Sequence, residues 1–320
     1  MFDVVAFGEL LIDFISDGVG TNGNPVYEAN PGGAPCNVLA MLEKLGYHTA
    51  FIGKVGKDDF GRQLIAALQS IGISTEGLIA DEKANTTLAF VHKKPDGDRD
   101  FSFYREKGAD TLLQKEEIDL SLLENCRIFH FGTLSMTDEP ALSATKFALE
   151  HAKRAGALVS FDPNYRPPLW KNEALAKKAA LYGIKNCDIL KIADNELQWL
   201  TGIEDIDSAV EQLKQQSSAK LMFVTLGKKG SLAYTQNRKV YAPAFLTPKT
   251  VDTTGAGDTF CACALGFTLQ HGIYDLTEKQ LSDLLRFANA AASIVTTRKG
   301  ALLSMPEQKE IEALFHEKEA

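Results

Sequence analysis

Short, strongly apolar runs alternate with helical patterns along most of this chain. The apolar runs occupy residues 4–8, 49–56, 128–132, 158–162, 188–193 and 221–227, and the helical patterns between them include 36–45, 60–70, 140–155 and 208–215. Strands that are apolar on both faces and separated by helices are typical of a parallel sheet covered by helices on both sides. The sequence therefore predicts an α/β fold with a mostly parallel central sheet. In such sheets ligands bind beyond the carboxyl ends of the strands.

Two pairs of segments depart from this alternation. Residues 86–92 and 99–105 alternate between apolar and polar, as a half-exposed hairpin does, and 95–98 form a plausible turn between them. Residues 14–16 and 26–29 look like a second pair of short strands. We expect these pairs, near 14–30 and 86–105, to form a small β-lid over the strand ends. With no internal repeat or linker, 1–320 are expected to make one domain.

The composition narrows the class of protein. The chain has 320 residues, 45% of them hydrophobic, with a net charge of −8 and no long basic run, which argues against a nucleic-acid surface. The apolar N-terminus carries three carboxylates and no basic start, unlike a signal peptide, and no apolar run approaches the ~18 residues of a membrane span. The five cysteines form no disulfide-like or metal-binding pattern. A cytoplasmic protein that acts on a small molecule fits these observations.

The segment DTTGAGDTF (252–260) contains the most specific candidate site. A helical pattern begins at Asp258, and the small residues Gly255, Ala256 and Gly257 stand directly before it. The free N–H groups at a helix start, beside the positive end of the helix dipole, make an anion site that phosphate commonly occupies. Asp258 then places a carboxylate beside that site. The alternative, for this motif alone, is that Asp258 only caps the helix.

A second glycine motif, PGGAPCN (31–37), precedes the helical pattern at 36–45. Gly32 and Gly33 would allow a ligand close to the backbone, and the Asn37 carboxamide offers both a donor and an acceptor. Asp13 is a carboxylate among apolar neighbours, so it should be paired, at the surface or bound to a ligand. A carboxylate and a carboxamide together suit sugar hydroxyls. A purely structural Gly-Gly turn is the alternative.

Two further groups of residues should reach the ligand edge. DPNYR (162–166) follows a strand directly, so Asn164 and Arg166 should project there, and Arg105 ends the predicted lid hairpin. The alternatives are a local turn for Asp-Pro-Asn and solvated charges for both arginines. Thr225, Gly227 and Gly230 form a tight turn in VTLGKKGS (224–231), and Asn289 lies in a helical segment of small residues. Both features suit a nucleotide-binding site. For the helical segment, packing against another helix is the alternative. No P-loop pattern is present.

Taken in order, these motifs resemble those of the ribokinase-like (PfkB-type) sugar kinases over nearly the whole chain. PGGAPCNVLAMLEKLG is similar to the first signature of that family, and DTTGAGDTF to its second. Within the family, GELLIDF, FYREKGADTLL, HFGTLSM and DPNYRPPLW most resemble fructokinases. The resemblance implies a ribokinase-like fold with the predicted β-lid.

The resemblance also implies a role for each matching position. Asp258 would be the general base, and Gly255, Ala256 and Gly257 the anion hole for the γ-phosphoryl group. The sugar would be held by Asp13, Gly32, Gly33, Asn37, Arg105, Asn164 and Arg166. ATP and Mg²⁺ would be bound near Lys191, Glu196, Thr225, Gly227, Gly230 and Asn289, with Ala193 where the family's N-x-x-E motif has its asparagine. A K⁺ site would involve Asp252, Thr254, Gly300 and Ser304.

These residues together predict an ATP-dependent fructokinase that phosphorylates the 6-hydroxyl of D-fructose. A kinase of the same family that acts on 2-keto-3-deoxygluconate or on ribose is the nearest alternative, because two arginines could hold a sugar-acid carboxylate. A non-catalytic sugar or nucleotide sensor is the alternative from another class. Pairing of two lids in a homodimer is also expected from the resemblance.

Overall fold

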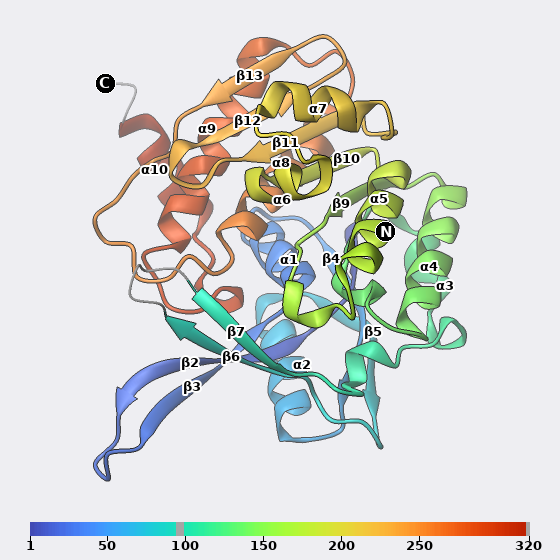
Figure 1. Ribbon diagram of the computed structural model, residues 1–320, viewed down its shortest axis with the longest axis vertical. Coiled ribbons are helices and arrows are strands. Elements are labelled where there is room, and N and C mark those ends of the chain that lie inside the picture. The colour runs from blue at the N-terminus through green and yellow to red at the C-terminus, as the bar shows by residue number, and fades with distance from the viewer. Residues whose placement is uncertain (94–98, 318–320) are drawn as a thin grey trace.

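The central sheet of the protein has nine strands. The computed structural model describes residues 1–93 and 99–317 (Figure 1). In chain order the nine strands are β1 (Phe2–Phe7), β4 (Thr49–Gly56), β5 (Ser74–Asp81), β8 (Cys126–Gly132), β9 (Leu158–Asp162), β10 (Ile189–Ala193), β11 (Leu221–Thr225), β12 (Ser231–Tyr234) and β13 (Lys239–Ala242). Their order across the sheet is β13-β12-β11-β10-β9-β8-β1-β4-β5. The pairs from β11 to β5 are parallel, and β12 and β13 add an antiparallel edge.

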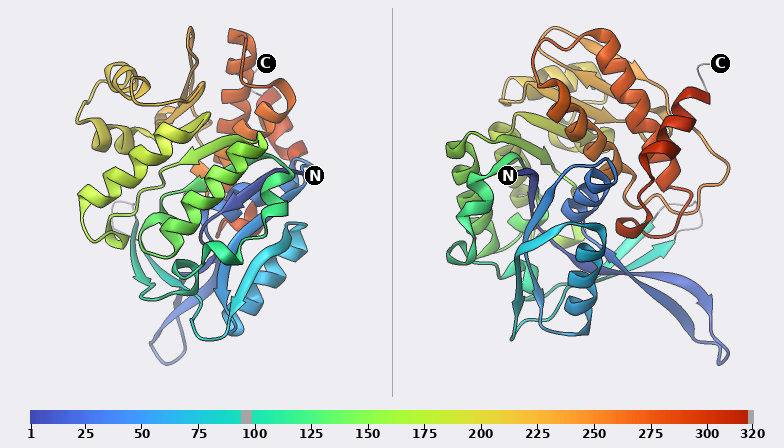
Figure 2. Two further views of the ribbon diagram at one scale, coloured as in Figure 1. Left: turned by 90° about the vertical axis from the view of Figure 1, so that its right-hand side faces the viewer. Right: turned by 180° about the vertical axis from the view of Figure 1, so that it is seen from behind.

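Helices cover both faces of this sheet (Figure 2). One face carries α1 (Ala34–Lys44), α2 (Asp59–Ile71), α8 (Ala256–His271), α9 (Glu278–Val295) and α10 (Gln308–Glu317), whose buried residues share one hydrophobic cluster. A second cluster joins the other face to α3 (Leu120–Glu124), α4 (Ala141–Ala155), α5 (Glu173–Asn186), α6 (Asp194–Thr201) and α7 (Ile206–Lys214). Strand β1 divides its side chains between the clusters in alternation, as a strand with two buried faces must.

Short 3₁₀ turns occur in several loops, namely η1 (Ala109–Thr111), η2 (Lys115–Glu117), η3 (Leu134–Met136), η4 (Pro167–Leu169), η5 (Gly227–Lys229) and η6 (Leu302–Ser304).

A separate sheet of four strands forms the lid. It has the order β3-β2-β6-β7, with bounds β2 (Leu11–Val19), β3 (Pro25–Gly32), β6 (Leu88–Lys93) and β7 (Arg99–Tyr104). Strands β2 and β3 continue away from the body as a two-stranded arm at the lower left of Figure 1. Phe14 and Phe90 stack across β2 and β6, with ring centroids 4.8 Å apart. At the other end of the β2–β3 pair, the start of β2 lies beside the end of β3, where Leu11 pairs with Gly32 of the Gly-Gly segment.

The predicted fold class is confirmed. All six predicted core strands are present, although the last one ends at Thr225, two residues early, because the chain turns into η5. Strand β5 and the antiparallel edge strands β12 and β13 were not predicted. The expected turn at 95–98 lies outside the described residues. The five cysteines are all free and buried, and no described helix is long and apolar enough to cross a membrane.

Candidate active site

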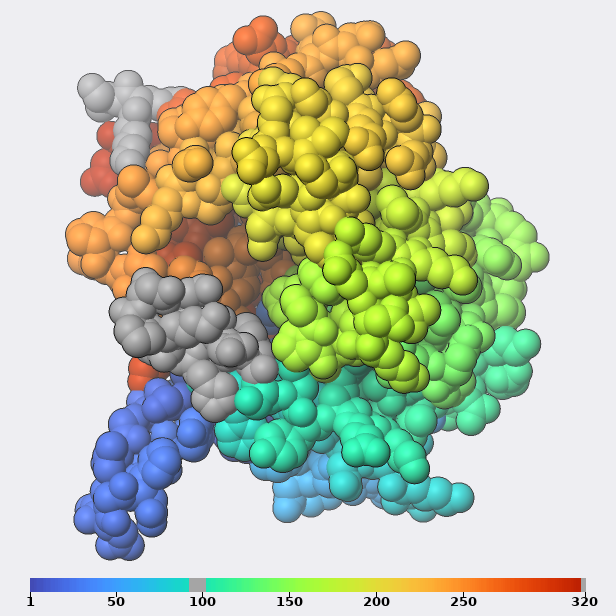
Figure 3. Space-filling view, in the orientation of Figure 1, coloured from blue at the N-terminus to red at the C-terminus, as the bar shows by residue number. Residues whose placement is uncertain are grey.

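Helix α8 begins where the second signature ends, and its start faces a cavity at the carboxyl ends of the strands. The cavity has a volume of about 710 Å³, which is within the usual range for small-molecule sites. It opens in the face shown in Figure 3, beside the yellow-green segment around η4. Its lining includes many of the residues predicted to hold the sugar, the nucleotide with its magnesium, the transferring phosphoryl group or the K⁺ ion: Asp13, Gly33, Asn37, Asn164, Arg166, Lys191, Glu196, Thr254, Gly255, Gly257 and Asp258.

Gly255 allows helix α8 to start at this point. It is the residue before the first turn and has a left-handed backbone (φ 78°), which glycine adopts without a side-chain clash. A Cβ atom there would lie 2.7 Å from the Cβ atom of Ala301. The helix begins at Ala256, two residues earlier than the sequence predicted. The N–H groups of the first turn thus lie at the cavity wall that Gly255 and Gly257 form.

Asp258 lies in that first turn and is only 7% exposed. Its carboxylate accepts hydrogen bonds from Asn37 Nδ2 at 2.8 Å and from Asn164 Nδ2 at 3.4 Å. Burial raises the pKa of Asp258 from 3.8 to about 6; Asp162 also raises it, whereas Asn37, Lys191 and Arg166 lower it. A carboxylate with that pKa can accept a proton near neutral pH.

The cap-only explanation of Asp258 does not account for these contacts. Asp258 receives side-chain bonds from α1 and from the loop after β9, and no side-chain bond caps the start of α8. Asn37 Oδ1 is buried and has no hydrogen-bond partner among the described residues. A buried acceptor without a partner is costly, so this oxygen suits a ligand hydroxyl.

The Gly-Gly segment brings the sugar-side candidates together. A Cβ atom on Gly32 would lie 2.2 Å from Asp13 Oδ2, and one on Gly33 would lie 2.4 Å from the carbonyl oxygen of Glu9. Only glycine fits so close to these groups. Glu9, which the sequence analysis missed, lines the cavity and accepts a hydrogen bond from the N–H group of Ala34 at 2.8 Å. Its sequence signal is a charged residue directly after the first apolar strand.

Arg105 lies outside the lining of the cavity. Its guanidinium group is buried and donates to Asp110, to Thr137 Oγ1 and to the carbonyl oxygen of Leu134. Because Arg105 directly follows β7 of the lid, while Thr137 and Leu134 belong to the body, these bonds fasten the lid to the body. Direct contact between Arg105 and sugar stays a prediction. Arg166, in contrast, lines the cavity.

Glu196, at the wall of the cavity, links the loop after β9 to the end of β10. One carboxylate oxygen accepts the N–H group of Tyr165 at 2.7 Å, and the other accepts the N–H group of Ala193 at 2.9 Å. Burial raises the pKa of Glu196, and so does Asp162, while Lys191 opposes the shift. The described residues contain no cluster of three or more His, Cys, Asp or Glu side chains that could hold a metal ion. A magnesium contact of Glu196 stays a prediction.

Four of the six predicted nucleotide residues lie outside the lining of this cavity, namely Thr225, Gly227, Gly230 and Asn289, whereas Lys191 and Glu196 line it. Gly227 and Gly230 have left-handed backbones, with φ of 55° and 107°, in the turn that follows Thr225. Asn289 accepts from Ser231 Oγ and donates to the carbonyl oxygens of Ala242 and Pro243. The structure thus brings α9 and the β12–β13 edge together at Asn289. Base contacts by these four residues stay a prediction.

The predicted K⁺ residues are neighbours. Asp252 accepts the N–H groups of Thr254 at 2.8 Å and Gly300 at 3.3 Å, one with each carboxylate oxygen. A Cβ atom on Gly300 would lie 3.7 Å from Ser304 Oγ. Asp252 is buried, and a monovalent cation at these residues stays a prediction.

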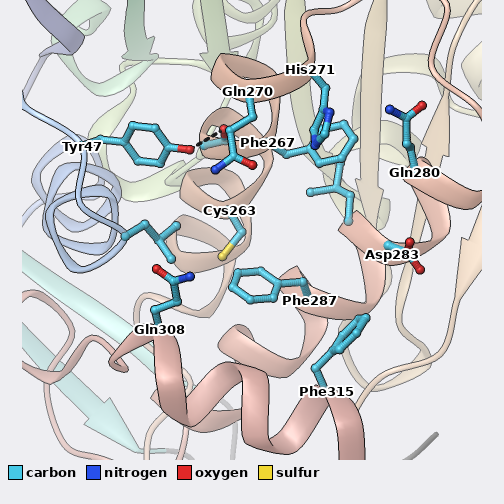
Figure 4. Close-up of a pocket in the computed structure, with 13 residues that line it drawn as sticks. Tyr47, Cys263, Phe267, Gln270, His271, Gln280, Asp283, Phe287, Gln308 and Phe315 are labelled. Atoms are coloured by element: carbon cyan, nitrogen blue, oxygen red, sulfur yellow. Dashed lines mark hydrogen bonds between the residues drawn. The ribbon is translucent and has the colours of Figure 1, made fainter.

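A second cavity lies further along the same helix. It has a volume of about 360 Å³ and shares no lining residue with the first. Figure 4 shows aromatic rings and carboxamides around it, with Cys263 on one wall and a hydrogen bond from Tyr47 Oη to the carbonyl oxygen of Gly266 at 2.8 Å. Its residues come mainly from α8, α9 and α10.

Comparison with known proteins identifies the family. The pfkB family carbohydrate kinase profile matches residues 1–308. The chain belongs to this family. It is 41% identical over 314 residues to a protein named probable fructokinase-4 of Arabidopsis thaliana, covering 98% of this chain and 96% of the relative. The protein is therefore a sugar kinase, a phosphotransferase with an alcohol group as acceptor.

Solved structures agree with the fold. A fructokinase from Xylella fastidiosa with bound ATP superimposes with a TM-score of 0.90 at 31% identity, covering all of both chains. A double mutant of fructokinase from Vibrio cholerae O395, bound to fructose, ADP and a potassium ion, gives a TM-score of 0.88 at 28% identity and covers 98% of each chain. This pfkB kinase thus has the ribokinase-like fold that the resemblance implied.

Proposed function

We propose that this pfkB kinase is an ATP-dependent fructokinase that converts D-fructose to D-fructose 6-phosphate. The observation that carries the proposal is the buried carboxylate of Asp258, held by Asn37 and Asn164 beside the free N–H groups at the start of α8. Fructokinase names among the relatives, and fructose and ADP in the Vibrio cholerae structure, support the choice of substrate and of nucleotide.

In the proposed mechanism the sugar lies between the lid and the start of α8. Asp13 and Asn37 hold its hydroxyl groups, and Leu11 and Phe103 of the lid cover its other side. Asp258 takes the proton of the 6-hydroxyl as that oxygen attacks the γ-phosphorus of ATP. Phosphoryl transfer depends mostly on positioning and charge neutralisation, and exclusion of water by the lid prevents wasteful hydrolysis.

The N–H groups at the start of α8 stabilise the charge on the transferring phosphoryl group. Magnesium, when bound with ATP near Glu196, neutralises charge on the phosphates. Asp252 and the backbone around Thr254 and Gly300 hold the anion-hole loop in shape, and a potassium ion would fit there. We further propose that the two lids of a homodimer pair, because Val19 and Tyr104 of the lid are 72% and 67% exposed.

The test is ADP release from purified protein with ATP, magnesium and potassium, using D-fructose, 2-keto-3-deoxygluconate and ribose in parallel. A kcat/KM at least tenfold higher for D-fructose is the expected result. Preference for 2-keto-3-deoxygluconate would instead assign Arg166 to its carboxylate. Binding of sugar and ATP with no ADP release in any reaction would contradict kinase activity and favour a sensor.

A further inference from the structure

Asp162 lies beneath the site cavity, at the residue where β9 ends. It is 3% exposed and does not belong to the lining of the cavity, so any effect on a ligand passes through its neighbours. Its carboxylate bonds two residues, Asn164 and Lys191, and both of them line the cavity. A buried acid is therefore attached to the site from behind.

One carboxylate oxygen of Asp162 fixes the turn that follows β9. It accepts the N–H group of Asn164 at 3.1 Å, which closes an Asx-turn over Pro163. The backbone of Asn164 is left-handed, with φ of 46°, a conformation that costs free energy for a residue with a Cβ atom. Thr133, in the loop after β8, donates to the carbonyl oxygen of Pro163 at 2.6 Å. The turn expected for Asp-Pro-Asn is therefore present and is held from two sides.

This turn brings the carboxamide of Asn164 to the proposed base. Asn164 is 8% exposed, and its Nδ2 atom donates to Asp258 Oδ1 at 3.4 Å. A change of the Asn164 backbone to the extended or right-handed region would redirect the side chain. Asn37 provides the other side-chain bond to Asp258, from α1 at 2.8 Å. Asp162 thus controls one of the two side-chain bonds described for the base.

The second carboxylate oxygen of Asp162 neutralises a cation. It lies 2.9 Å from Lys191 Nζ in a buried ion pair. Three charged groups act on Asp258: Asp162 from β9, Lys191 from β10 and Arg166 from the loop after β9. The two cations lower the pKa of Asp258, whereas Asp162 raises it. By offsetting Lys191, Asp162 preserves the proton affinity that a general base needs near neutral pH.

We propose that Asp162 is a positioning residue for phosphoryl transfer. It holds Asn164 in the turn from which the carboxamide reaches Asp258. It also pairs with Lys191, so that the base faces a neutralised cation. The inference rests on the proposed kinase function, and it applies whichever sugar is the acceptor. During transfer the hydroxyl proton passes to Asp258, and Asp162 keeps its charge.

The pH profile tests the charge of Asp162. Asp162→Asn keeps the shape of the side chain and removes its charge, which leaves Lys191 free to favour the ionised form of Asp258. We therefore expect the acid limb of kcat/KM to move to lower pH by about half a unit or more. ADP release measured against pH, with wild type and variant in parallel, gives this shift. Loss of stability alone would leave the limb in place.

A double-mutant cycle tests the turn. Asp162→Ala removes the turn acceptor, so kcat above the acid limb should fall about 10–100-fold. Asn164→Gly removes the carboxamide and takes the left-handed backbone without strain. If Asp162 acts through Asn164, adding Asp162→Ala to Asn164→Gly should lower kcat less than about fivefold further. If Asp162→Ala does not fold, the acid limb of Asp162→Asn decides alone.

Asp188→Asn is the control variant, because Asp188 accepts the N–H group of Val159 at 2.9 Å at the opposite end of β9 and β10. It should lose stability and keep both kcat and the acid limb. An acid limb of Asp162→Asn that stays in place or moves to higher pH overturns the proposal. An equal loss of kcat from Asp162→Ala with and without Asn164→Gly also overturns it. Absence of ADP release in the wild type would instead reject the kinase function itself.

Discussion

The two cavities along helix α8 differ in charge much more than in size. The site cavity, at the first turn, is lined by buried ionisable groups: Glu9, Asp13, Lys191, Glu196 and Asp258. The second cavity, two to three turns further along, is walled by aromatic side chains such as Phe267, Phe287 and Phe315, and its carboxylate, Asp283, is paired with Lys279. Several of its polar residues are bonded to groups outside the cavity: Asp283 to Lys279, Gln280 to Thr277 and Gln308 to Glu312.

The difference in buried ionisable groups distinguishes a ligand site from a packing cavity. Burying ionisable groups costs free energy, so a protein keeps them only where they are paired or needed by a ligand. The site cavity contains unused capacity, at Asn37 Oδ1 and at the Lys191 ammonium group. The contrast predicts that changes in the first cavity affect turnover, whereas changes in the second affect stability alone.

The largest expected effect comes from replacing Asp258 with asparagine. The variant keeps the shape of the side chain but cannot accept the hydroxyl proton, so kcat should fall by about 10²–10⁴-fold while ATP still binds. ADP release and ATP titration measure these two quantities. Asp283→Asn, on the other cavity, is the matched control and should keep kcat. Comparable activity in the two variants would contradict the role of Asp258.

Three glycines sharpen the comparison: Gly255 directly before α8, and Gly257 and Gly266 within it. In Gly255→Ala the new residue must take a left-handed backbone and meets Ala301, so we expect a loss of about 1–3 kcal/mol in the free energy of unfolding and a slower kcat. Gly257→Ala fits the helix but presses on Lys191, so kcat should fall about tenfold with little loss of stability.

Gly266→Ala is the control in the second cavity. Its Cβ atom would lie 2.9 Å from the ring of Tyr47, so stability should fall and kcat should not. Chemical denaturation and steady-state kinetics on the three variants separate these outcomes. A large loss of kcat in Gly266→Ala would end the distinction between the two cavities.

Much of the fold and the centre of the site could be predicted from sequence because local signals specify them. The alternation of apolar strands with helices indicates a parallel sheet, and Gly255 to Asp258 form a contiguous motif. The antiparallel edge was missed because β12 and β13 are four-residue strands with little pattern of their own. Arg105 and Asn289 were named for ligands, but their described partners are protein groups brought together by tertiary packing.

A smaller effect is expected from Glu9, whose burial should make the free energy of unfolding depend on pH. Burial raises the pKa of Glu9 from 4.5 to about 7, so the folded protein binds this proton more tightly than the unfolded chain does. That stabilisation is complete below pH 4.5 and is lost as the pH rises through 7. Between pH 6.5 and 8 it should fall by about 1 kcal/mol.

The comparison of wild type with Glu9→Gln isolates this group. Urea denaturation at pH 6.5 and pH 8 should show the wild type losing about 1 kcal/mol more than the variant between the two values. Gln280→Glu, on the other cavity, is the control. Its loss of stability between pH 6.5 and pH 8 should equal that of the wild type. An equal pH dependence in wild type and Glu9→Gln would show that Glu9 stays ionised.

The smallest expected effect is at Phe315, on the wall of the second cavity. Its ring lies 6.5 Å from that of Phe287, centroid to centroid, and is only half-buried, so Phe315→Leu should cost about 0.5 kcal/mol and leave kcat and both KM values unchanged. Thermal unfolding and steady-state kinetics on one preparation measure both. Helix α8 lines both cavities, so a shift of this helix at one cavity would reach the other. A change of more than threefold in kcat at Phe315→Leu would show that it does, and the second cavity would then be coupled to catalysis through α8.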